Sequence, residues 1–479
     1  FMLNHPKRIV MTTPNPYAHR TAQHFDGIRY DEALIQKYNR QGPRYTSYPT
    51  ALEFMPIEQG VEAQILVNRN PAIPLSLYIH IPFCHHLCYY CGCNKIITKK
   101  NSDAGDYLTY LFAEIRHKKS LLRGKTWVKQ LHLGGGTPTF LSDDELITLW
   151  DFLHEEFLFA DEGDFSIEID PRELRPNTLK ILKDLGFNRL SFGVQDLDKK
   201  VQIAVNRVQS LELIQNVMQE AQALGFSSTN IDLIYGLPHQ TPASMNATIE
   251  QIIKLSPDRL SVFNYAHLPE RFFAQKRILE ADLPSPTDKL TMFGNIITSL
   301  GDAGYQYIGI DHFAKPDDAM AIAQRQGKLH RNFQGYAILG ECDLLGFGVS
   351  AISQIGKHIL QNPTALVDYQ ATVLADTLPA IKHIQSDDKD ALRRHVIMNL
   401  LCHDYMSFED LHARFDIDAK EYFANEIKNL QDMQTDGLVQ IDEDGITILP
   451  KGRILGRSIA MVFDEYLGKK HTNRFSKVI

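Results

Sequence analysis

Cysteines are the residues of this chain whose spacing most clearly indicates chemistry. Four of the six cysteines fall within residues 84–93, where Cys84, Cys88 and Cys91 are separated by three and then two residues, and Cys93 follows. Three thiolates at this spacing can bind three irons of a cubane iron–sulfur cluster and leave the fourth iron open, which is typical of a reactive site. The alternative is a structural zinc site. Such sites usually pair two Cys-x2-Cys arms from separate segments, and the sequence offers no second arm.

A run of three glycines, Gly134 to Gly136, precedes Thr137 and follows a β-like run at residues 128–133. Glycine lets the backbone approach a ligand closely and exposes its N–H and C=O groups. By itself such a triplet is a weak signal, because most glycine runs are only turns. Its position one strand after the cysteines makes it a candidate ligand-binding turn.

Polar and apolar side chains alternate along three consecutive β-like runs, so that the polar ones share one face of each strand. A packed parallel barrel would fill its interior with Val, Ile and Leu. We therefore expect an open interior that holds a large polar ligand, with Glu168 and Asp232 serving that ligand rather than the fold. The polar positions are Ser166, Glu168 and Asp170, then Ser191, Gly193 and Gln195, then Asn230 and Asp232.

These residues need a scaffold that brings strand ends together. Between residues 74 and 266 the chain repeats a β-like run, a polar or Gly-rich turn and an amphipathic helical stretch. Such alternation predicts an α/β fold with a parallel sheet, whose ligands lie at the carboxyl ends of the strands. Six units predict a partial (βα)6 TIM-like barrel. The expected strands are Leu75–Phe83, Val128–Leu133, Phe165–Asp170, Arg189–Gln195, Asn230–Tyr235 and Arg259–Tyr265.

The flanking segments suggest three parts. We expect an N-terminal arm over the active site (1–65), the barrel with its closing segments (66–380), and a mainly helical, winged-helix-like C-terminal domain with a small β-hairpin (381–479). Residues 1–30 lack periodicity and are expected to be mobile. Two prolines predict that Gly42–Thr50 runs extended.

Other elements follow from periodicity and caps. Helices are expected at residues 30–38 and 286–300, and Ser407 with Asp410 forms the sequence pattern of a capping box. Segments without a clean period read as loops: Tyr305–Phe313, His330–Tyr336 and Leu344–Ile352. The C-terminal elements are the helices Asp390–Cys402, Ser407–Phe415 and Ala419–Met433 and the hairpin Leu438–Leu449.

Composition and charge exclude several classes of function. A net charge of -8 argues against bulk affinity for nucleic acid or anionic membranes. The winged-helix pattern raises nucleic-acid binding as a rival, but residues 404–450 hold twelve Asp or Glu against three Lys or Arg, a surface that repels phosphate. No run approaches the roughly 18 apolar residues of a membrane span, and the opening residues lack a signal peptide. We expect a cytoplasmic protein.

The cysteine motif after a first β-strand resembles the radical S-adenosylmethionine (SAM) superfamily. The flanking Tyr78-Ile-His-Ile-Pro-Phe-Cys84 and Cys91-Gly-Cys-Asn-Lys95 resemble its coproporphyrinogen dehydrogenase branch. The similarity runs from Gly42–Thr50 to Arg474–Ile479, which is nearly the whole chain.

The resemblance implies a [4Fe–4S] cluster on Cys84, Cys88 and Cys91, together with two molecules of SAM. It implies catalytic roles for Cys93, Tyr78 and Glu168, and cations for the substrate's propionates among Arg44, Arg172 and Arg207. The arm would add Tyr45 and Tyr48 as substrate contacts. The implied SAM contacts are Tyr78, Gly135, Gly136, Thr137, Glu168, Gln195, Arg207 and Asp232, with Ala266, Phe333, Gln334 and Ile352 at the second molecule.

The implied reaction converts two propionate side chains of coproporphyrinogen III to vinyl groups through a 5′-deoxyadenosyl radical, giving protoporphyrinogen IX in haem synthesis. It implies an electron donor such as flavodoxin or ferredoxin, a monomer, and no nucleic-acid partner. The closest alternative is a haem chaperone of the same branch, a carrier that typically lacks the fourth cysteine and the arm. Both features are present here. The other alternative is a non-catalytic iron–sulfur or zinc protein with a nucleic-acid-binding tail.

Overall fold

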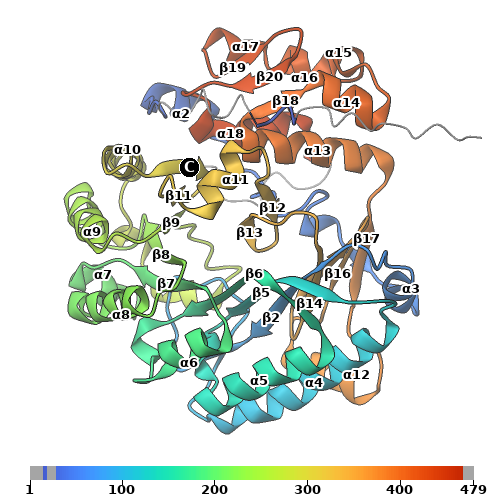
Figure 1. Cartoon of the computed structure of the whole chain (residues 1–479). Helices are drawn as coiled ribbons and strands as arrows, with labels where there is room; N and C mark the ends of the chain where they lie inside the picture. Colours follow the sequence, from blue (N-terminus) through green and yellow to red (C-terminus); the bar gives the residue numbers. More distant parts are fainter. Residues whose placement is uncertain (1–14, 19–27, 468–479) are drawn as a thin grey trace, which may run out of the picture.

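The computed structural model describes residues 15–18 and 28–467. Most of the polar stretch at residues 1–30, which we expected to be mobile, and the terminal residues 474–479 lie outside the described residues. The molecule consists of a curved sheet wrapped by helices, with a helical layer across its open side (Figure 1). No helix in the described part combines the length and the apolar character that a membrane crossing requires.

The predicted parallel sheet is confirmed. All six predicted strands form and pair in chain order, each parallel to the next, within a sheet of 13 strands in the described chain. Parallel pairing aligns their carboxyl ends at one edge, where the polar residues were expected to meet. These strands are β2 (Leu75–Ile81), β5 (Trp127–Gly135), β6 (Leu158–Ile169), β7 (Arg189–Gln195), β8 (Ser228–Tyr235) and β9 (Arg259–Asn264).

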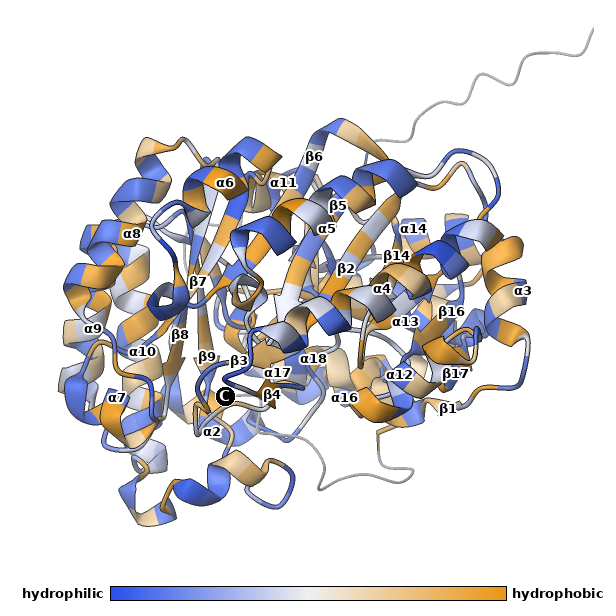
Figure 2. Cartoon of the chain, turned by 90° about the horizontal axis from the view of Figure 1, so that it is seen from below, coloured by the Kyte–Doolittle hydropathy of each residue, from blue (hydrophilic) through white to orange (hydrophobic). Residues whose placement is uncertain are grey.

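Amphipathic helices cover the outer face of the sheet (Figures 1 and 2). Their starts follow from local chemistry: Ser142 and Glu145 exchange hydrogen bonds in a capping box, and Thr241 accepts a hydrogen bond from the Ser244 N–H just before Pro242. The helices are α4 (Ser102–Leu121), α5 (Asp143–Glu156), α6 (Thr178–Leu185), α7 (Lys199–Ala204), α8 (Leu211–Ala223), α9 (Pro242–Leu255) and α10 (Pro286–Asp302).

The three segments expected to be loops instead form strands, so that expectation was wrong. In β14 (Asp343–Phe347) every residue is buried, and a strand covered on both faces leaves no alternation to detect. This strand runs parallel to β2 and extends the sheet on that side. The further strands are β10 (Gln306–Gly309), β11 (His312–Ala314), β12 (His330–Asn332), β13 (Gly335–Ala337), β15 (Ile352–Ile355), β16 (His358–Gln361), β17 (Lys382–Gln385) and the edge strand β1 (Met55–Pro56).

The C-terminal layer contains the predicted helices and hairpin, with two differences. The third helix is broken into three short pieces, and a strand that the sequence did not reveal, β18 (Tyr405–Ser407), pairs with the hairpin. Ser407 accepts from the Asp410 N–H, which is the capping half of the predicted box. The elements are α13 (Asp388–His403), α14 (Phe408–Phe415), α15 (Ala419–Tyr422), α16 (Ala424–Asn429), α17 (Gln431–Thr435), β19 (Val439–Ile441), β20 (Gly445–Ile448) and α18 (Gly456–Ala460).

The N-terminal arm is fastened to the C-terminal end of the described chain. After α2 (Glu32–Tyr38), residues Gly42–Thr50 form no helix, as predicted, but they are not extended throughout, because Tyr45 has a φ of +47° and residues 46–49 bend. Tyr45 and Tyr48 are fully buried. The Tyr45 hydroxyl donates to Asp464 Oδ2 at 2.8 Å, and the Tyr48 hydroxyl accepts from the Glu465 N–H at 3.2 Å. The expectation that both tyrosines contact substrate was therefore wrong, because these contacts place them in the core.

A buried ionic network joins four elements on one side of the sheet: α3 (Val61–Val67), α4, α12 (Leu366–Leu374) and β14. Lys118 of α4 lies 2.8 Å from Glu114 and 3.3 Å from Glu62 of α3, and its ammonium donates to the Gly346 carbonyl of β14 at 3.2 Å. Tyr369 of α12 donates to Glu114 at 2.6 Å. The side chain of Lys118 is only 1% exposed, so the two carboxylates depend on it for their compensating charge.

We expect Lys118→Met to lower the free energy of unfolding by about 3–5 kcal/mol, because it leaves buried carboxylates without a cation. The matched control is Lys180→Met, which removes an exposed pair with Asp184 at the same i, i+4 spacing and should cost about 0.5 kcal/mol or less. Urea unfolding of both variants measures the difference. Equal costs would contradict the role given to Lys118.

Candidate active site

The carboxyl ends of the central strands enclose a cavity of about 690 Å³. Most residues proposed from the sequence meet there, although they come from separate strands and loops. Polar faces of β6, β7 and β8 supply its inner wall, as the period-two alternation predicted. The predicted site residues on its wall are Cys84, Cys88, Cys91, Cys93, Gly135, Gly136, Thr137, Glu168, Gln195, Arg207, Asp232 and Ala266.

The cysteine loop begins where β3 (Phe83–Cys84) ends and is held in place mainly by backbone contacts. The Tyr89 N–H donates to the Val205 carbonyl at 3.0 Å, and the Asn206 amide donates to the Leu87 carbonyl at 2.8 Å. On the other side, the Gln275 amide donates to the Tyr90 carbonyl at 3.0 Å. These contacts fix the loop while leaving its thiols facing the cavity.

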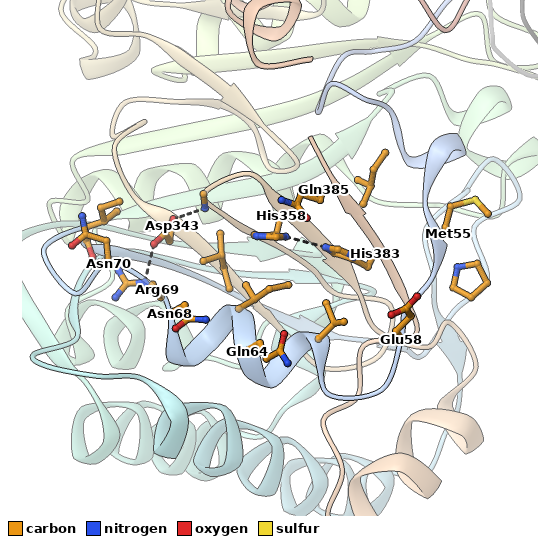
Figure 3. Close-up of a pocket in the computed structure, with 17 residues that line it drawn as sticks. Met55, Glu58, Gln64, Asn68, Arg69, Asn70, Asp343, His358, His383 and Gln385 are labelled. Carbon is orange, nitrogen blue, oxygen red and sulfur yellow. Dashed lines mark hydrogen bonds and ion pairs between the residues drawn. The ribbon is translucent and has the colours of Figure 1, made fainter. Parts of the chain in front are cut away.

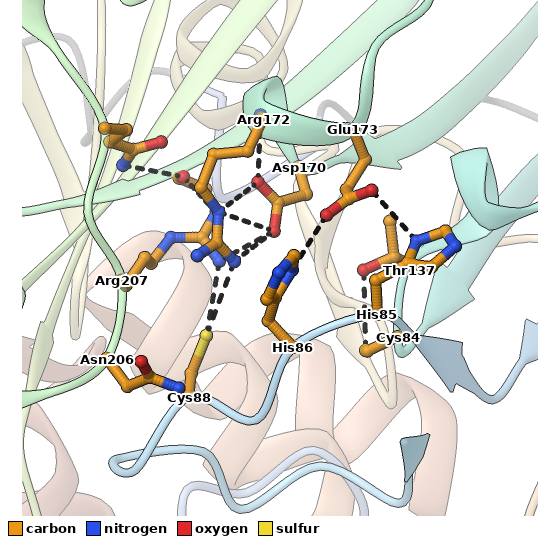
Figure 4. A network of polar contacts seen from close by, with 12 residues as sticks. Cys84, His85, His86, Cys88, Thr137, Asp170, Arg172, Glu173, Asn206 and Arg207 are labelled. Carbon is orange, nitrogen blue, oxygen red and sulfur yellow. Dashed lines mark hydrogen bonds and ion pairs between the residues drawn. The ribbon is translucent and has the colours of Figure 1, made fainter. Parts of the chain in front are cut away.

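Two arginines reach the sulfur of Cys88 from the opposite wall (Figure 4). Arg207 Nη1 and Arg172 Nη2 lie 3.6 and 3.7 Å from Cys88 Sγ, and both guanidinium groups bind Asp170. Burial opposes ionisation of Asp170, but Arg207 and Arg172 outweigh it and hold the pKa of this carboxyl below its usual value. Arg172 is thus committed to Asp170 and the cysteine loop, and the expectation that it binds a propionate is not supported by its position.

Cys91 and Cys93 form a coupled pair of thiols beside Lys95. The Cys93 thiol donates to Cys91, and this bond, against the effect of burial and with help from Lys95, lowers the pKa of Cys91 to about 6. The same contact raises the pKa of Cys93 well above its usual value. Lys95 Nζ also donates to the Cys91 carbonyl at 3.0 Å. At neutral pH, Cys91 is therefore ready to act as a thiolate ligand, whereas Cys93 retains its proton.

The glycine turn connects the cysteine loop to the end of β5. Gly136 N–H donates to the Ile81 carbonyl at 2.8 Å, and a Cβ at Gly136 would lie 2.6 Å from the Pro82 oxygen. At Gly135 a φ of +122° also requires glycine. Its N–H donates to Glu168 Oε2 at 3.1 Å. The triplet is thus in close backbone contact with the end of β2 and the residues before the cysteine loop, and its predicted close approach to a ligand stays a prediction.

Glu168 and Asp232 face the same cavity with opposite electrostatics. Burial opposes the charge of Glu168, but hydrogen bonds from His132 and the Gly135 N–H hold its pKa below the usual value. Burial and the nearby charge of Glu168 raise the pKa of Asp232 to about 6. Glu168 therefore has a second role that the sequence did not predict, since it also anchors the glycine turn.

Tyr78 lies behind the wall of the cavity rather than in it. Its hydroxyl is 3.1 Å from His80 Nδ1, and His80 Nε2 is 2.9 Å from the Asn94 carbonyl, beside Cys93. Its ring stacks on His132, whose Nε2 is 3.2 Å from Glu168. Tyr78 thus contacts His80 and His132, neither of which lines the cavity itself, and its expected direct contact with a cofactor stays a prediction.

The residues present fit a cluster and a polar cofactor. Oxygen atoms of two wall residues, Gln195 Oε1 and Asn264 Oδ1, and the nitrogen Arg207 Nε are buried without hydrogen-bond partners, so the wall offers both acceptors and a donor to a ligand. Within residues 15–18 and 28–467, no three His, Cys, Asp or Glu side chains converge on a single metal ion. The predicted cluster ligands Cys84, Cys88 and Cys91 all line the cavity.

Besides Tyr78, three predicted cofactor-binding residues are not on this wall. Phe333 and Gln334 form the turn of the β12–β13 hairpin, where Phe333 packs edge-on against Phe54. Ile352 begins β15 and pairs with Gln361 of β16. Ile352 thus lies outside the residues that line this cavity, two strands beyond β2 in the sheet, and its expected place beside Ala266 stays a prediction. Gln334 Nε2, however, is buried without a partner and can still donate to a ligand.

Sequence reasoning missed several residues of the site. His132 and His80 continue the inward alternation of β5 and β2, so the period-two rule could have found them. Asn264 ends β9 and could have been found in the same way. Lys95 lies in a loop, and Phe272 and Gln275 lie at and in the short 3-10 helix Phe273–Arg277, segments whose course no periodicity reveals.

A second cavity of about 690 Å³ lies at the far side of the sheet, between α3 and the strands β16 and β17 (Figure 3). His358 Nδ1 and His383 Nε2 approach to 3.0 Å there, and Arg69 pairs with Asp343 at 2.8 Å. Burial lowers the pKa of both histidines. No residue proposed from the sequence lines this cavity, and two of its charged groups, Arg69 and Asp343, are paired with each other.

Comparison with known proteins identifies the class. The family model of the radical SAM superfamily matches residues 78–252, and that of the HemN C-terminal domain matches residues 387–455. Oxygen-independent coproporphyrinogen III oxidase from Escherichia coli (strain K12) is 50% identical over 454 residues, covering 94% of this chain and 99% of that protein. The protein of that name from Synechocystis sp. is 41% identical over 462 residues, covering 95% and 99%.

A solved structure agrees. Coproporphyrinogen III oxidase (HemN) from E. coli, described as a radical SAM enzyme, superposes with a TM-score of 0.88 at 49% identity, covering 92% of this chain and 100% of that one. The curved parallel sheet with three thiols at its carboxyl edge is thus the fold and site of a radical SAM enzyme. Within that superfamily, the chain belongs to the family of oxygen-independent coproporphyrinogen III oxidases.

The different surroundings of the two carboxylates lead to a prediction about stability. The pKa of Asp232 is about 6 in the folded protein, compared with about 3.9 for an ordinary Asp. The protonated carboxyl therefore contributes its full stabilisation below about pH 4, and this contribution is lost as pH rises through 6. As pH rises from 5 to 7.5, the unfolding temperature of Asp232→Asn should therefore increase relative to that of the parent protein. Calorimetry of both apo proteins across this range measures the difference.

Glu168→Ala is the contrasting variant. It should lower the free energy of unfolding by about 1–3 kcal/mol at pH 7.5, because Gly135 N–H and His132 lose their acceptor. Both variants should lose SAM cleavage after cluster reconstitution. A destabilised Asp232→Asn protein, or parental SAM cleavage by either variant, would assign that carboxylate to the scaffold.

Proposed function

We infer that this chain is an oxidoreductase that converts two propionate side chains of coproporphyrinogen III to vinyl groups, giving protoporphyrinogen IX in haem biosynthesis. The observation that carries this function is the cavity that gathers Cys84, Cys88 and Cys91, in a chain 50% identical over nearly its full length to oxygen-independent coproporphyrinogen III oxidases. Haem carriage by a chaperone is the alternative, and Cys93 on the same wall argues against it.

When bound, the reduced cluster and SAM together supply a 5′-deoxyadenosyl radical that abstracts hydrogen from the β-carbon of a propionate. The chain's own residues provide placement. Cys84, Cys88 and Cys91 would hold the cluster, with Arg172 and Arg207 stabilising the charge on Cys88. Gln195 and Asp232 would orient SAM, and Glu168 would accept its amino group beside the glycine turn. Arg44, whose guanidinium pairs with Asp311 at 2.5 Å, closes the wall on the side of the arm.

Cys93 is proposed to act in turnover without binding the cluster. Its thiol is exposed to the cavity and keeps its proton while it hydrogen-bonds Cys91. A proton held at this sulfur is available to a substrate or cofactor group in the cavity. Tyr78 would act indirectly, by fixing His80 and His132.

Further properties remain proposals. We propose that a second SAM molecule rests against Ala266, Phe333, Gln334 and Ile352, which the partnerless Gln334 amide supports. We propose a cytoplasmic monomer with an arm at 1–65, a barrel at 66–380 and a C-terminal domain at 381–479. An electron donor such as flavodoxin or ferredoxin would approach near the cysteine loop, where Phe273 is 75% exposed and Lys276 lies over its ring.

Anaerobic reconstitution tests the function. The protein with iron, sulfide, SAM and a reductant should release protoporphyrinogen IX and carbon dioxide from coproporphyrinogen III. Cys93→Ser should keep the parental iron content and ultraviolet–visible spectrum but lose turnover at least about 100-fold. Stoichiometric haem binding without product would support the chaperone alternative. Loss of the cluster in Cys93→Ser would show that the three-ligand assignment is wrong.

The number of SAM molecules can be counted directly. Equilibrium dialysis of the reconstituted protein should give two SAM per cluster, falling to one in Gln334→Ala because the second site loses its amide donor. The control is Gln324→Ala, since that glutamine is buried but binds the Ile308 and Cys402 carbonyls instead. One SAM per cluster in the parent would remove the second site.

A further inference from the structure

A third cavity, of about 540 Å³, lies between α13 and the amino ends of β2 and β5, with the β12–β13 hairpin beside it (Figure 1). Its floor is Ser76 and Gln130, which belong to the same inward faces that carry Tyr78 and His132 further along. Its other walls contain Arg331 and Arg394. Among the described residues, no Asp or Glu lines it, which is notable in a chain of net charge -8.

The two inner arginines have no carboxylate partners in the described part of the chain. Arg331 is 5% exposed, donates through Nε to the Arg44 carbonyl at 3.1 Å, and leaves Nη1 without a hydrogen bond. The guanidinium of Arg394 donates through Nη1 and Nη2 to the amide oxygen of Gln354, which is a neutral group. Burial lowers the pKa of Arg394 to about 10, so it remains charged at neutral pH. Buried charge without an opposite charge is costly, and it is usually compensated by a partner.

The outer cations of the cavity differ from the inner ones. Lys357 pairs with Asp388 at 2.6 Å and Arg414 with Asp410 at 2.7 Å, and both are more than half exposed. Two polar atoms on the floor, Ser76 Oγ and Gln130 Oε1, are buried without partners. Two of the unpartnered groups around this cavity, the Ser76 hydroxyl and Arg331 Nη1, are donors that an anion could satisfy, whereas Gln130 Oε1 is an acceptor that needs a donor instead.

The cavity is adjacent to the active site. Arg44 links the two, because its guanidinium lines the catalytic cavity and its carbonyl accepts from Arg331. Along β5, Gln130 on this floor and Gly135 on the catalytic wall are about 17 Å apart at the usual rise per residue. A substrate with several carboxylate arms on one large ring could reach both ends of this inner face.

We propose that Arg331 and Arg394 bind the carboxylate of a propionate that is not reacting, and so position coproporphyrinogen III while another propionate is decarboxylated. This inference rests on the proposed function and names its positioning residues. A guanidinium supplies two parallel N–H donors to a carboxylate, and no Asp or Glu among the described lining residues competes for them. The same groups could in principle hold the carboxylate of SAM, which the experiment separates.

The test is Arg394→Gln in the reconstituted holoenzyme. Its KM for coproporphyrinogen III, and its Kd from equilibrium binding without reductant, should rise about tenfold or more, as for loss of a charge-assisted hydrogen bond. The kcat should stay within about threefold, and SAM stoichiometry and substrate-free SAM cleavage should not change. Arg394→Lys should restore part of the affinity, and Arg331→Gln should repeat the effect. The control is Arg116→Gln, an exposed arginine remote from both cavities.

The outcomes separate the two hypotheses. If the parent makes protoporphyrinogen IX while Arg394→Gln and Arg331→Gln bind substrate as tightly as Arg116→Gln, the inference alone is overturned. If the variants lose SAM rather than substrate, the carboxylate belongs to SAM and the inference is equally overturned. If the parent neither binds nor converts coproporphyrinogen III, both the proposed function and this inference are overturned. Thermal unfolding at the parental temperature shows that the variants are folded.

Discussion

The active site depends on one close contact between backbones. The end of β5 can meet the end of β2 only because Gly136 has no side chain, since a Cβ there would lie 2.6 Å from the Pro82 oxygen. This contact fixes the start of the cysteine loop relative to the polar faces of β6, β7 and β8. It also turns the Gly135 N–H toward Glu168. Cluster ligands and cofactor contacts, which belong to different βα units, are thereby held in one fixed arrangement.

Electrostatics divides the cavity into two halves. Around Cys88, two guanidinium groups and Asp170 form a positively charged wall that favours thiolates. Deeper inside, Glu168 is charged, while Asp232 carries a raised pKa because the same burial is not offset by a cation. Carboxylates on one polar face thus have different protonation behaviour, which follows from their neighbours rather than from their depth.

The sequence predicted the parts of the molecule that repeat a simple period. The six parallel strands and their inward polar residues follow from alternation, and Cys84, Cys88 and Cys91 follow from spacing. Alternation is lost in fully buried strands, which is why β14 escaped notice. The positions of Tyr45 and Tyr48 also could not be predicted, because the arm is held by hydrogen bonds to residues more than 400 positions away. Long-range pairing of this kind leaves no local pattern.

The hydrogen bond between Tyr45 of the arm and Asp464 has a consequence for the synthesis of the protein on the ribosome. Because the arm supplies Arg44 to the catalytic wall and is anchored by Tyr45 to the last described segment, this wall cannot be completed until almost the whole chain has left the ribosome. At the usual 5–20 residues per second, roughly 20 seconds or more separate emergence of the cysteine loop from emergence of its final anchor. Throughout that interval the thiols face solvent, so the nascent chain is open to iron–sulfur delivery, and equally to oxidation, before the cavity closes.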